Sequence, residues 1–213
     1  MTVSVEENGR KPLNMNGVET PEQSVSCKKA LRKEKIALRR AISPVDRVRA
    51  DSRINDLIRS ILPPVEDFST VVGYVTDGSE PDLTPIMEEL LAAGKILCLP
   101  RFLDAEHYDL AVSEDLDFQQ KKFGIPEPSQ NAPVASAEIL DQALWLIPGV
   151  AFDENCNRLG RGKGVYDRLL SKHRYKRAIG IFYECQKCTV IPADPHDKKL
   201  DAIVTENAVY SAF

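Results

Sequence analysis

The sequence has no apolar run of the roughly 18–20 residues that a membrane-spanning helix requires, which argues against an integral membrane protein. Its first residues contain no apolar core of the kind that marks a secretory signal. Glu6 and Glu7 are atypical of a transit peptide, which is poor in acidic residues. The formal net charge is −4, whereas a general nucleic-acid binder needs a broad basic face. We therefore expect a cytoplasmic protein that has neither a membrane nor a nucleic acid as its partner.

Cysteine and histidine are few and scattered. The five cysteines, an odd number, are typical of reduced thiols in a chain without a secretory signal. Cys185 and Cys188 form a C-x-x-C pair, but a zinc site needs about four ligands and no second pair follows at a suitable spacing. A redox pair would open a helix after a strand, whereas residues 189–191 read Thr-Val-Ile. A structural or incidental role is favoured for this pair. No covalent nucleophile motif is present either, and the histidines form none: His107, His173 and His196.

What the sequence does contain is typical of one globular domain. Of its 213 residues, 43% are hydrophobic and 28% are charged. Apolar, β-branched runs predict strands at 70–75, 95–99, 108–112, 143–147, 177–183 and 202–205. Helical patterns predict helices at 28–41, 43–62, 83–93 and 163–173. Continuous apolar strands that alternate with helices indicate a mostly parallel sheet covered on both faces. We predict a mobile polar tail at 1–25 and a single three-layer α/β domain at 26–213.

Individual residues add detail to the prediction of two of these helices. In the first helix, apolar residues at roughly helical spacing suggest an amphipathic, basic helix: Leu31, Ile36, Leu38 and Ile42. In the second helix, Ser43 is suited to the N-cap, Pro44 to the first turn, and Asp46 to the positive end of the dipole. Residues 126–133 are rich in proline and are predicted to be a loop.

The most informative segment is residues 158–167, which read Arg-Leu-Gly-Arg-Gly-Lys-Gly-Val-Tyr-Asp. Alternating glycines remove side-chain bulk, so backbone N–H groups can approach an anion closely. Arg158, Arg161 and Lys163 add three positive charges within six positions, and a predicted helix begins directly after them. Asp167 in the first turn of that helix is suited to hold Mg²⁺ against phosphates. The segment therefore predicts a site for a nucleotide phosphate chain.

Other interpretations of this loop remain open at this point. It is not a Walker loop, because no Ser or Thr follows Lys163, and it is not G-x-G-x-x-G, because Val165 replaces the third glycine. A solvated basic turn and a short RNA-contacting Arg-Gly segment are the alternatives. The brevity of the segment and the acidic total charge argue against RNA.

Residues 158–167 resemble the signature loop of the 5-formyltetrahydrofolate cyclo-ligase family, also called methenyltetrahydrofolate synthetases. The resemblance extends over most of the chain, from Cys27 to Glu206. It includes these further segments and positions: 28–32, Glu80, 100–101, 125–128, 148–153, 196–201 and 204–206. The family converts 5-formyltetrahydrofolate to 5,10-methenyltetrahydrofolate, with ATP consumed to ADP and phosphate. The resemblance implies Mg²⁺ as the cofactor, ATP and a reduced folate as small-molecule partners, and a monomer.

The resemblance also implies roles for particular residues. ATP would contact Lys28, Lys29, Ala30, Leu31, Arg32, Arg158, Leu159, Gly160, Arg161, Gly162, Lys163, Gly164, Val165 and Tyr166. The folate would contact Arg32, Val75, Glu80, Arg161, Gly162, Lys163, Gly164 and Val165. Asp167 and Asp197 would hold Mg²⁺, and Arg161 and Lys163 would be catalytic. The reaction implied is phosphoryl transfer to the formyl oxygen, followed by attack of N10 and departure of phosphate.

One position departs from the family pattern. The family usually has two tyrosines before the loop aspartate, where this chain has Val165 and Tyr166. Valine offers less stacking area and no hydroxyl. The alternative hypothesis is therefore a non-catalytic or differently specific nucleotide- or folate-binding paralogue. Elsewhere, Trp145 lies within an apolar strand and is predicted to be part of the core. Arg101 lies just after another predicted strand, and for this residue a structural role is favoured over a phosphate contact.

Overall fold

The computed structural model describes residues 21–104, 107–116, 118, 120–122, 125–192, 194 and 197–211. Most of the predicted polar tail lies outside these residues. The first helix, α1, spans Pro21–Arg40 and therefore begins within the segment predicted to be tail. His196, part of the segment that resembles the family, is also outside the described residues.

Helices and strands alternate along most of the chain. The remaining helices are α2 (Pro44–Ile61), α3 (Thr84–Ala92), α4 (Ala137–Leu140), α5 (Val165–Lys172) and the 3₁₀ turns η1 (Val65–Asp67) and η2 (Glu184–Gln186). The strands are β1 (Thr70–Val72), β2 (Ile96–Phe102), β3 (Tyr108–Ser113), β4 (Gln120–Lys122), β5 (Ile125–Glu127), β6 (Leu144–Pro148), β7 (Ala151–Phe152), β8 (Arg158–Leu159), β9 (Arg177–Ile181), β10 (Ala202–Val204) and β11 (Val209–Ser211).

A seven-stranded sheet forms the centre of the molecule, in the order β11-β10-β9-β6-β1-β2-β3. The five central strands are parallel to their neighbours, and only the edge strands β3 and β11 pair antiparallel. The two short hairpins, β4-β5 and β7-β8, stand apart from this sheet. The prediction of a mostly parallel sheet is confirmed.

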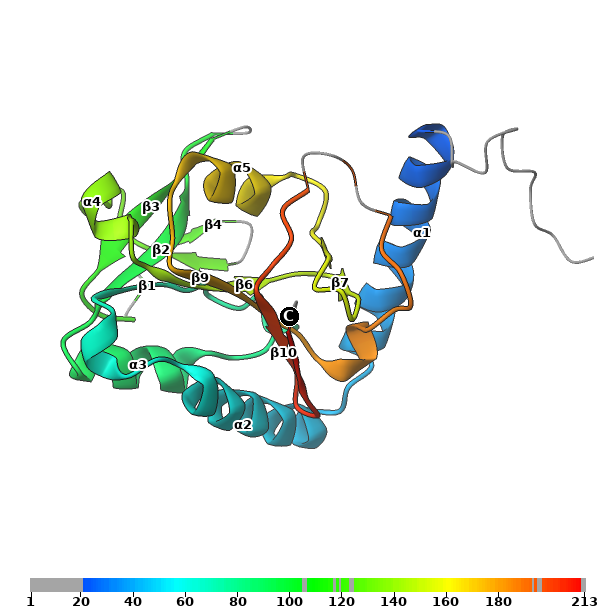
Figure 1. Ribbon diagram of the computed structural model, residues 1–213, viewed down its shortest axis with the longest axis horizontal. Helices are drawn as coiled ribbons and strands as arrows, with labels where there is room; N and C mark the ends of the chain where they lie inside the picture. Colours follow the sequence, from blue (N-terminus) through cyan, green and yellow to red (C-terminus); the bar gives the residue numbers. More distant parts are fainter. Residues whose placement is uncertain are drawn as a thin grey trace, which may run out of the picture.

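Two apolar clusters cover the two faces of the sheet, and successive residues of one strand contribute to different clusters. Leu144 and Leu146 of β6 pack with the cluster beneath α2 and α3, whereas Trp145 and Ile147 pack with the cluster beneath α4 and α5. Figure 1 shows α2 and α3 on one side of the sheet and α5 on the other. The three-layer prediction is confirmed, and Trp145 is core as expected, with no exposed surface.

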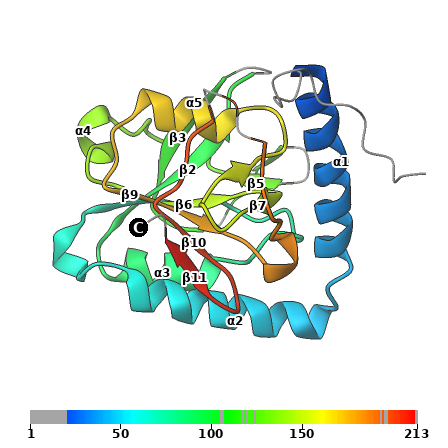
Figure 2. The same cartoon turned by 45° about the vertical axis from the view of Figure 1, so that its right-hand side comes forward.

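Helix α1 lies beside these layers, next to η2 and the β7-β8 hairpin (Figures 1 and 2). Its inward stripe is basic rather than apolar: Lys28, Lys35 and Arg39 are buried, at a spacing of seven and four residues. Leu38, predicted to be an inward apolar position, is 44% exposed. The apolar pattern expected for this helix is therefore partly wrong, because polar partners on the facing loops accept the cations.

Local signals place the start of α2 correctly and the start of α5 less well. The Ser43 hydroxyl accepts a hydrogen bond from the Asp46 amide at 3.2 Å, so the predicted N-cap of α2 is confirmed. Helix α5 begins at Val165, two residues later than predicted, because Gly162 and Gly164 adopt positive φ angles of 97° and 61° that no helix allows. The predicted proline-rich loop overlaps the hairpin strand β5, whose single proline, Pro126, lies in a short, half-buried strand.

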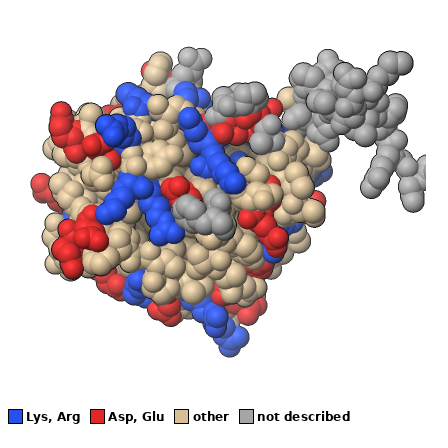
Figure 3. All heavy atoms as spheres, in the orientation of Figure 1, with Lys and Arg blue, Asp and Glu red and all other residues tan. Residues whose placement is uncertain are grey.

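Charges of both signs are interspersed on the face drawn in Figure 3, so this face carries no broad basic surface for nucleic acid. None of the described helices combines the length and the apolar character that a membrane span needs.

Candidate active site

A pocket of about 950 Å³ opens at the carboxyl ends of β1 and β6. Tyr74 and Val75, which follow β1, line one wall, and Pro148 and Gly149, at the end of β6, line the floor. Open α/β sheets place ligands at this edge because the loops that follow parallel strands converge there. The volume is near the upper end of the roughly 300–1,000 Å³ found for small-molecule sites.

The glycine-rich loop forms the longest continuous part of the pocket wall, since every residue from 158 to 168 lines it. Gly162 and Gly164 need their left-handed conformation, which a residue with a Cβ adopts only with strain. Gly164 is the N-cap of α5 and provides no side-chain acceptor, so the first amides of that helix are not capped by it. The positive end of α5 therefore lies at the pocket.

Three arginines brace this loop. The Nε of Arg32 donates to the carbonyl of Gly160 at 2.8 Å, and Nη1 of Arg168 donates to the carbonyl of Lys163 at 2.7 Å. Arg158 is almost fully buried, stands 5.6 Å from the centre of the Tyr166 ring, and donates through Nη2 to Asp167 at 2.8 Å. Its Nε is buried without a hydrogen-bond partner among the described residues. The loop is thus preformed and retains an unused donor.

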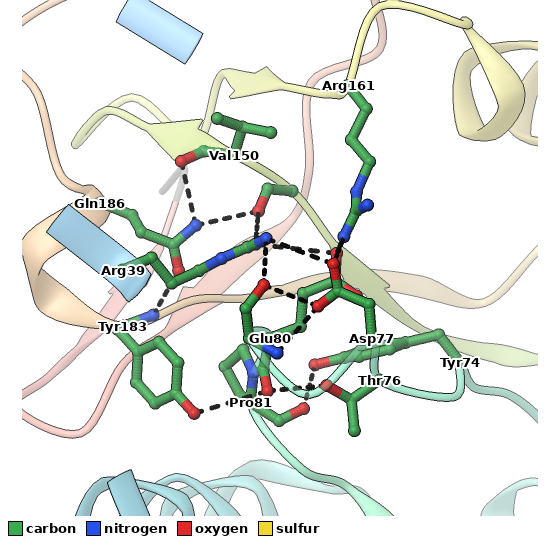
Figure 4. Close-up of polar contacts among 12 residues, drawn as sticks. Arg39, Tyr74, Thr76, Asp77, Glu80, Pro81, Val150, Arg161, Tyr183 and Gln186 are labelled. Atoms are coloured by element: carbon green, nitrogen blue, oxygen red, sulfur yellow. Dashed lines mark hydrogen bonds and ion pairs between the residues drawn. The ribbon is translucent and has the colours of Figure 1, made fainter. Parts of the chain in front are cut away.

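Arg161, another cation of the glycine-rich loop, reaches across the pocket to two carboxylates that follow β1 (Figure 4). Its Nη2 donates to Asp77 and, at 2.8 Å, to Glu80. Burial acts to lower the pKa of Arg161, but Glu80 and Asp77 outweigh it and raise that pKa. Burial also acts to raise the pKa of Asp77, but hydrogen bonds from Ser79 and Arg161 outweigh it, so the pKa falls well below its usual range.

Sequence reasoning predicted Arg161 and Glu80 but missed Arg39, the second cation of this cluster. Arg39 lies on α1, is 2% exposed, and has Nη atoms 3.7 Å from Glu80 and 3.9 Å from Asp77. Asp77 was missed as well, because nothing in the local sequence distinguishes it from an ordinary turn residue. The regular spacing of Lys28, Lys35 and Arg39 places three cations on one helical face, but a solvated helix carries the same pattern.

Only two of the five residues predicted on α1 to contact ATP line the pocket. Lys28 and Arg32 do so, whereas Lys29 and Ala30 are exposed and Leu31 packs against a small apolar cluster. The ammonium of Lys28 contacts Asp194 at 2.7 Å and Asp197 at 2.8 Å. Burial acts to lower the pKa of Lys28, but the two carboxylates outweigh it and raise that pKa. Asp194 is a further pocket residue that sequence reasoning missed.

The two residues predicted to hold Mg²⁺, Asp167 and Asp197, both line the pocket. Each contacts a cationic side chain, Arg158 for Asp167 and Lys28 for Asp197. The described residues contain no cluster of three or more Asp, Glu, His or Cys side chains that could hold a metal alone. This donor set fits Mg²⁺ that arrives with a phosphate chain, since Mg²⁺ is commonly bound by one or two carboxylates together with substrate phosphates.

Apolar side chains also line the pocket. They include Val75, Tyr108, Pro126, the half-buried Val165 and the buried Tyr74. Tyr74 is fixed in place because its hydroxyl donates to the carbonyl of Pro81 at 2.8 Å. The pocket therefore combines a cationic loop with apolar side chains suited to a planar ring.

Two candidates from the sequence lie outside the site. Arg101 donates to both carboxylate oxygens of Asp109, at 3.0 and 2.7 Å, and to three backbone carbonyls, so its role is structural as favoured. Burial raises the pKa of the Cys185 and Cys188 thiols, which disfavours the reactive thiolate. Cys188 also donates to the carbonyl of Phe152 at 3.2 Å. These contacts favour the structural interpretation of the C-x-x-C pair.

The parallel sheet and the glycine-rich, cationic pocket at its carboxyl edge together define an open α/β fold of the class that serves small-molecule enzymes.

Comparison with known proteins identifies the family. The sequence model of the 5-formyltetrahydrofolate cyclo-ligase family matches residues 24–206. The 5-formyltetrahydrofolate cyclo-ligase of Mus musculus is 28% identical over 86% of this chain and 95% of its own length. That of Escherichia coli K12 is 31% identical over 70% of this chain and 84% of its own length. A solved 5,10-methenyltetrahydrofolate synthetase from Aquifex aeolicus superposes with a TM-score of 0.73 and 31% identity, covering 87% of this chain and 92% of that one.

The chain belongs to the 5-formyltetrahydrofolate cyclo-ligase family. It is accordingly an enzyme of the ligase class.

Proposed function

We propose that this enzyme cyclises 5-formyltetrahydrofolate to 5,10-methenyltetrahydrofolate, with ATP converted to ADP and phosphate in a magnesium-dependent reaction. One observation carries the proposal: a cationic surface from the glycine-rich loop and an apolar surface that includes Val75, Tyr108 and Pro126 line one pocket of about 950 Å³. A triphosphate needs the first surface, and a planar pterin-type ring needs the second. A single pocket that holds both brings the two substrates into contact.

The residues of the loop are suited to the phosphate end. Backbone amides at Gly162, Gly164 and the start of α5 would face the anion, and Lys163 and Arg161 would neutralise charge that develops during phosphoryl transfer. Arg158 contributes a buried guanidinium whose Nε is still unpaired among the described residues. Lys28 and Arg32 extend this cationic surface from α1.

The carboxylates have two tasks. Glu80, with Val75 beside it, would face the folate, since a buried carboxylate is a strong acceptor for ring N–H groups. Asp167 and Asp197 would hold Mg²⁺, which supplies charge neutralisation between phosphate oxygens when bound. Both carboxylates would then exchange a cationic side chain for the metal.

The proposed chemistry makes a poor leaving group into a good one. The formyl oxygen attacks the γ-phosphorus of ATP, the bond to ADP breaks, and the formyl carbon becomes an imidate-like phosphate ester. N10 of the folate attacks that carbon and loses its proton to water or to the departing phosphate, and phosphate leaves with the former formyl oxygen. The protein positions the two substrates and stabilises charge, and no side chain needs to form a covalent bond.

The decisive test is a coupled assay with purified protein. With Mg-ATP and 5-formyltetrahydrofolate, we expect the absorbing methenyl product to appear in step with ADP, one for one. Omission of ATP or chelation of Mg²⁺ should stop both signals. Binding of both substrates without product would instead favour the non-catalytic paralogue, and product without ATP would rule out the phosphoryl-transfer mechanism. A monomeric state and a cytoplasmic location stay predictions from the sequence.

A further inference from the structure

Arg39 is the most deeply buried cation in the region of the pocket, with 2% of its surface exposed. Its Nη1 donates to the carbonyl of Gly149 at 3.1 Å, and its Nη2 donates to the Ser79 hydroxyl at 2.8 Å. The same guanidinium lies 3.7 Å from Glu80 and 3.9 Å from Asp77. Arg39 does not line the pocket itself. It thus stands behind the two carboxylates and fixes them to the ends of β1 and β6.

Two arginines therefore share the carboxylates Asp77 and Glu80, and they differ in exposure to solvent. Figure 4 shows Arg39 and Arg161 approaching the carboxylates from different sides. The Arg161 side chain is 46% exposed and belongs to a loop in which Gly162 and Gly164 have positive φ, whereas Arg39 is enclosed and anchored to a backbone carbonyl. Arg161 is therefore the accessible partner of the carboxylates, and Arg39 is the enclosed one.

We propose that Arg39 is a positioning residue: it remains as counter-ion of Asp77 and Glu80 when Arg161 leaves them for the phosphate of ATP. This inference rests on the proposed function, in which Arg161 contacts phosphate. Glu80 is buried, and its side chain is only 7% exposed. An unpaired carboxylate there is strongly disfavoured, because a buried charge without a partner loses its hydration without compensation. Arg39 removes that obstacle to the movement of Arg161.

Loss of Arg39 has a specific consequence. Asp77 and Glu80 would then have Arg161 as their only cationic partner among the described residues, so Arg161 would be retained by them and withheld from phosphate. Nucleotide binding and kcat should both fall, while the folded structure persists. Removal of one carboxylate together with Arg39 restores the balance of charge and should release Arg161 again. The signature of the proposal is therefore a non-additive pair of substitutions.

The test is a double-mutant cycle with Arg39→Gln, Asp77→Asn and the combined variant. The readouts are kcat per active enzyme, KM for each substrate, and calorimetric Kd for a non-hydrolysable ATP analogue. We expect Arg39→Gln to lower kcat at least about tenfold and to weaken analogue binding. The combined variant should recover kcat at least about fivefold relative to Arg39→Gln. Arg59→Gln, which removes a surface arginine paired with Glu89, is the matched control and should change neither readout.

Additive losses, or a change in melting temperature alone with normal kcat and analogue Kd, would overturn the proposal. If Arg39→Gln does not fold, the combined variant is compared with Asp77→Asn: activity within about threefold supports the proposal, and an inactive or unfolded combined variant overturns it. The variant Arg161→Gln distinguishes an error in the proposed function from an error in the role of Arg39. If it retains full ATP-dependent turnover, the proposed phosphate contact is wrong. If it is inactive but the cycle is additive, only the role of Arg39 is rejected.

Discussion

Arg158 and Asp167, at the two ends of the glycine-rich loop, are joined by a hydrogen-bonded ion pair of 2.8 Å between Nη2 and Oδ1. The pair closes the intervening residues into a ring, which fixes the shape of the loop. It also occupies the carboxylate that is proposed to hold Mg²⁺. Loop geometry and metal binding are therefore coupled through one side chain.

Asp167→Asn should separate these two effects. The amide keeps the size of the side chain and can still accept a hydrogen bond from Arg158, but it is a poor ligand for Mg²⁺. We expect the Mg²⁺ concentration for half-maximal activity to rise about tenfold or more, judged by the 10–100-fold effects of disturbed metal sites. A magnesium titration of the coupled assay measures this. An unchanged midpoint would remove Asp167 from the metal site.

Lys163→Ala should remove a cation from the phosphoryl-transfer site. By comparison with the loss of single stabilising donors in other enzymes, kcat should fall about 10²–10³-fold. Steady-state kinetics and a circular dichroism melt measure activity and folding together. Lys33→Ala, on the exposed face of α1, is the control and should leave kcat unchanged. Full activity of the Lys163 variant would show that the site assignment is wrong.

Gly162→Ala tests whether the backbone of the loop matters for function or only for stability. Gly162 has a φ of 97°, and Gly94, which closes α3 away from the pocket, has a φ of 74°. Alanine at either position should cost about 1 kcal/mol of stability, because a Cβ disfavours this conformation. Only Gly162→Ala should also weaken binding of an ATP analogue. Equal binding by the two variants would argue against a backbone cradle for phosphate.

Asp77 should make stability depend on pH in the acid range. Its pKa in the folded protein lies below the ordinary 3.8, so the charged form is favoured by folding. The stabilisation is therefore fully present above about pH 4 and is lost as pH falls through the lower folded pKa. Asp77→Asn should flatten the decline of the melting temperature between pH 4 and pH 2. Asp56→Asn, at an exposed surface pair, is the comparison and should preserve the decline.

Val165→Tyr should tighten folate binding. Val165 lines the pocket, and a tyrosine ring there would stack on a planar ligand. A gain of about 0.5–1.5 kcal/mol corresponds to a KM for 5-formyltetrahydrofolate lowered about 2- to 10-fold. Val190→Tyr places the same ring on the surface and should have no effect, since Val190 is exposed. A raised KM for Val165→Tyr would indicate a pocket adapted to valine.

The sequence predicted the centre of the fold better than its edges. Strands β6 and β9 are continuous apolar runs because both of their faces are buried, and that pattern is local. Strand β11 was missed because Val209 and Ser211 are exposed and it has only three residues. The hairpin β7-β8 was missed for a similar reason, since strands of two residues have no measurable alternation.

The same distinction applies to the candidate site. The glycine-rich loop could be predicted because its cations and glycines are contiguous in the sequence. Arg39, Asp77 and Asp194 could not, because each owes its place to partners far away in the chain, as Lys28 and Asp194 do across 166 positions. The apolar residues of α1, among them Leu38, predicted an apolar buried face, whereas the buried face is basic. Without knowledge of the facing loops, a buried cationic stripe is indistinguishable from a solvated one.

The way α1 attaches to the domain has a consequence for how this enzyme can vary. Arg32, Lys35 and Arg39 donate to main-chain carbonyls of Gly160, Cys185 and Gly149. Every residue type supplies such an acceptor, so these three contacts do not depend on which side chains the facing residues carry. They do depend on the register of the helix itself. One inserted or deleted residue within 32–39 would rotate part of the basic stripe by about 100° about the helix axis. The side chains beyond that point would then no longer reach their carbonyl acceptors, whatever residue is added.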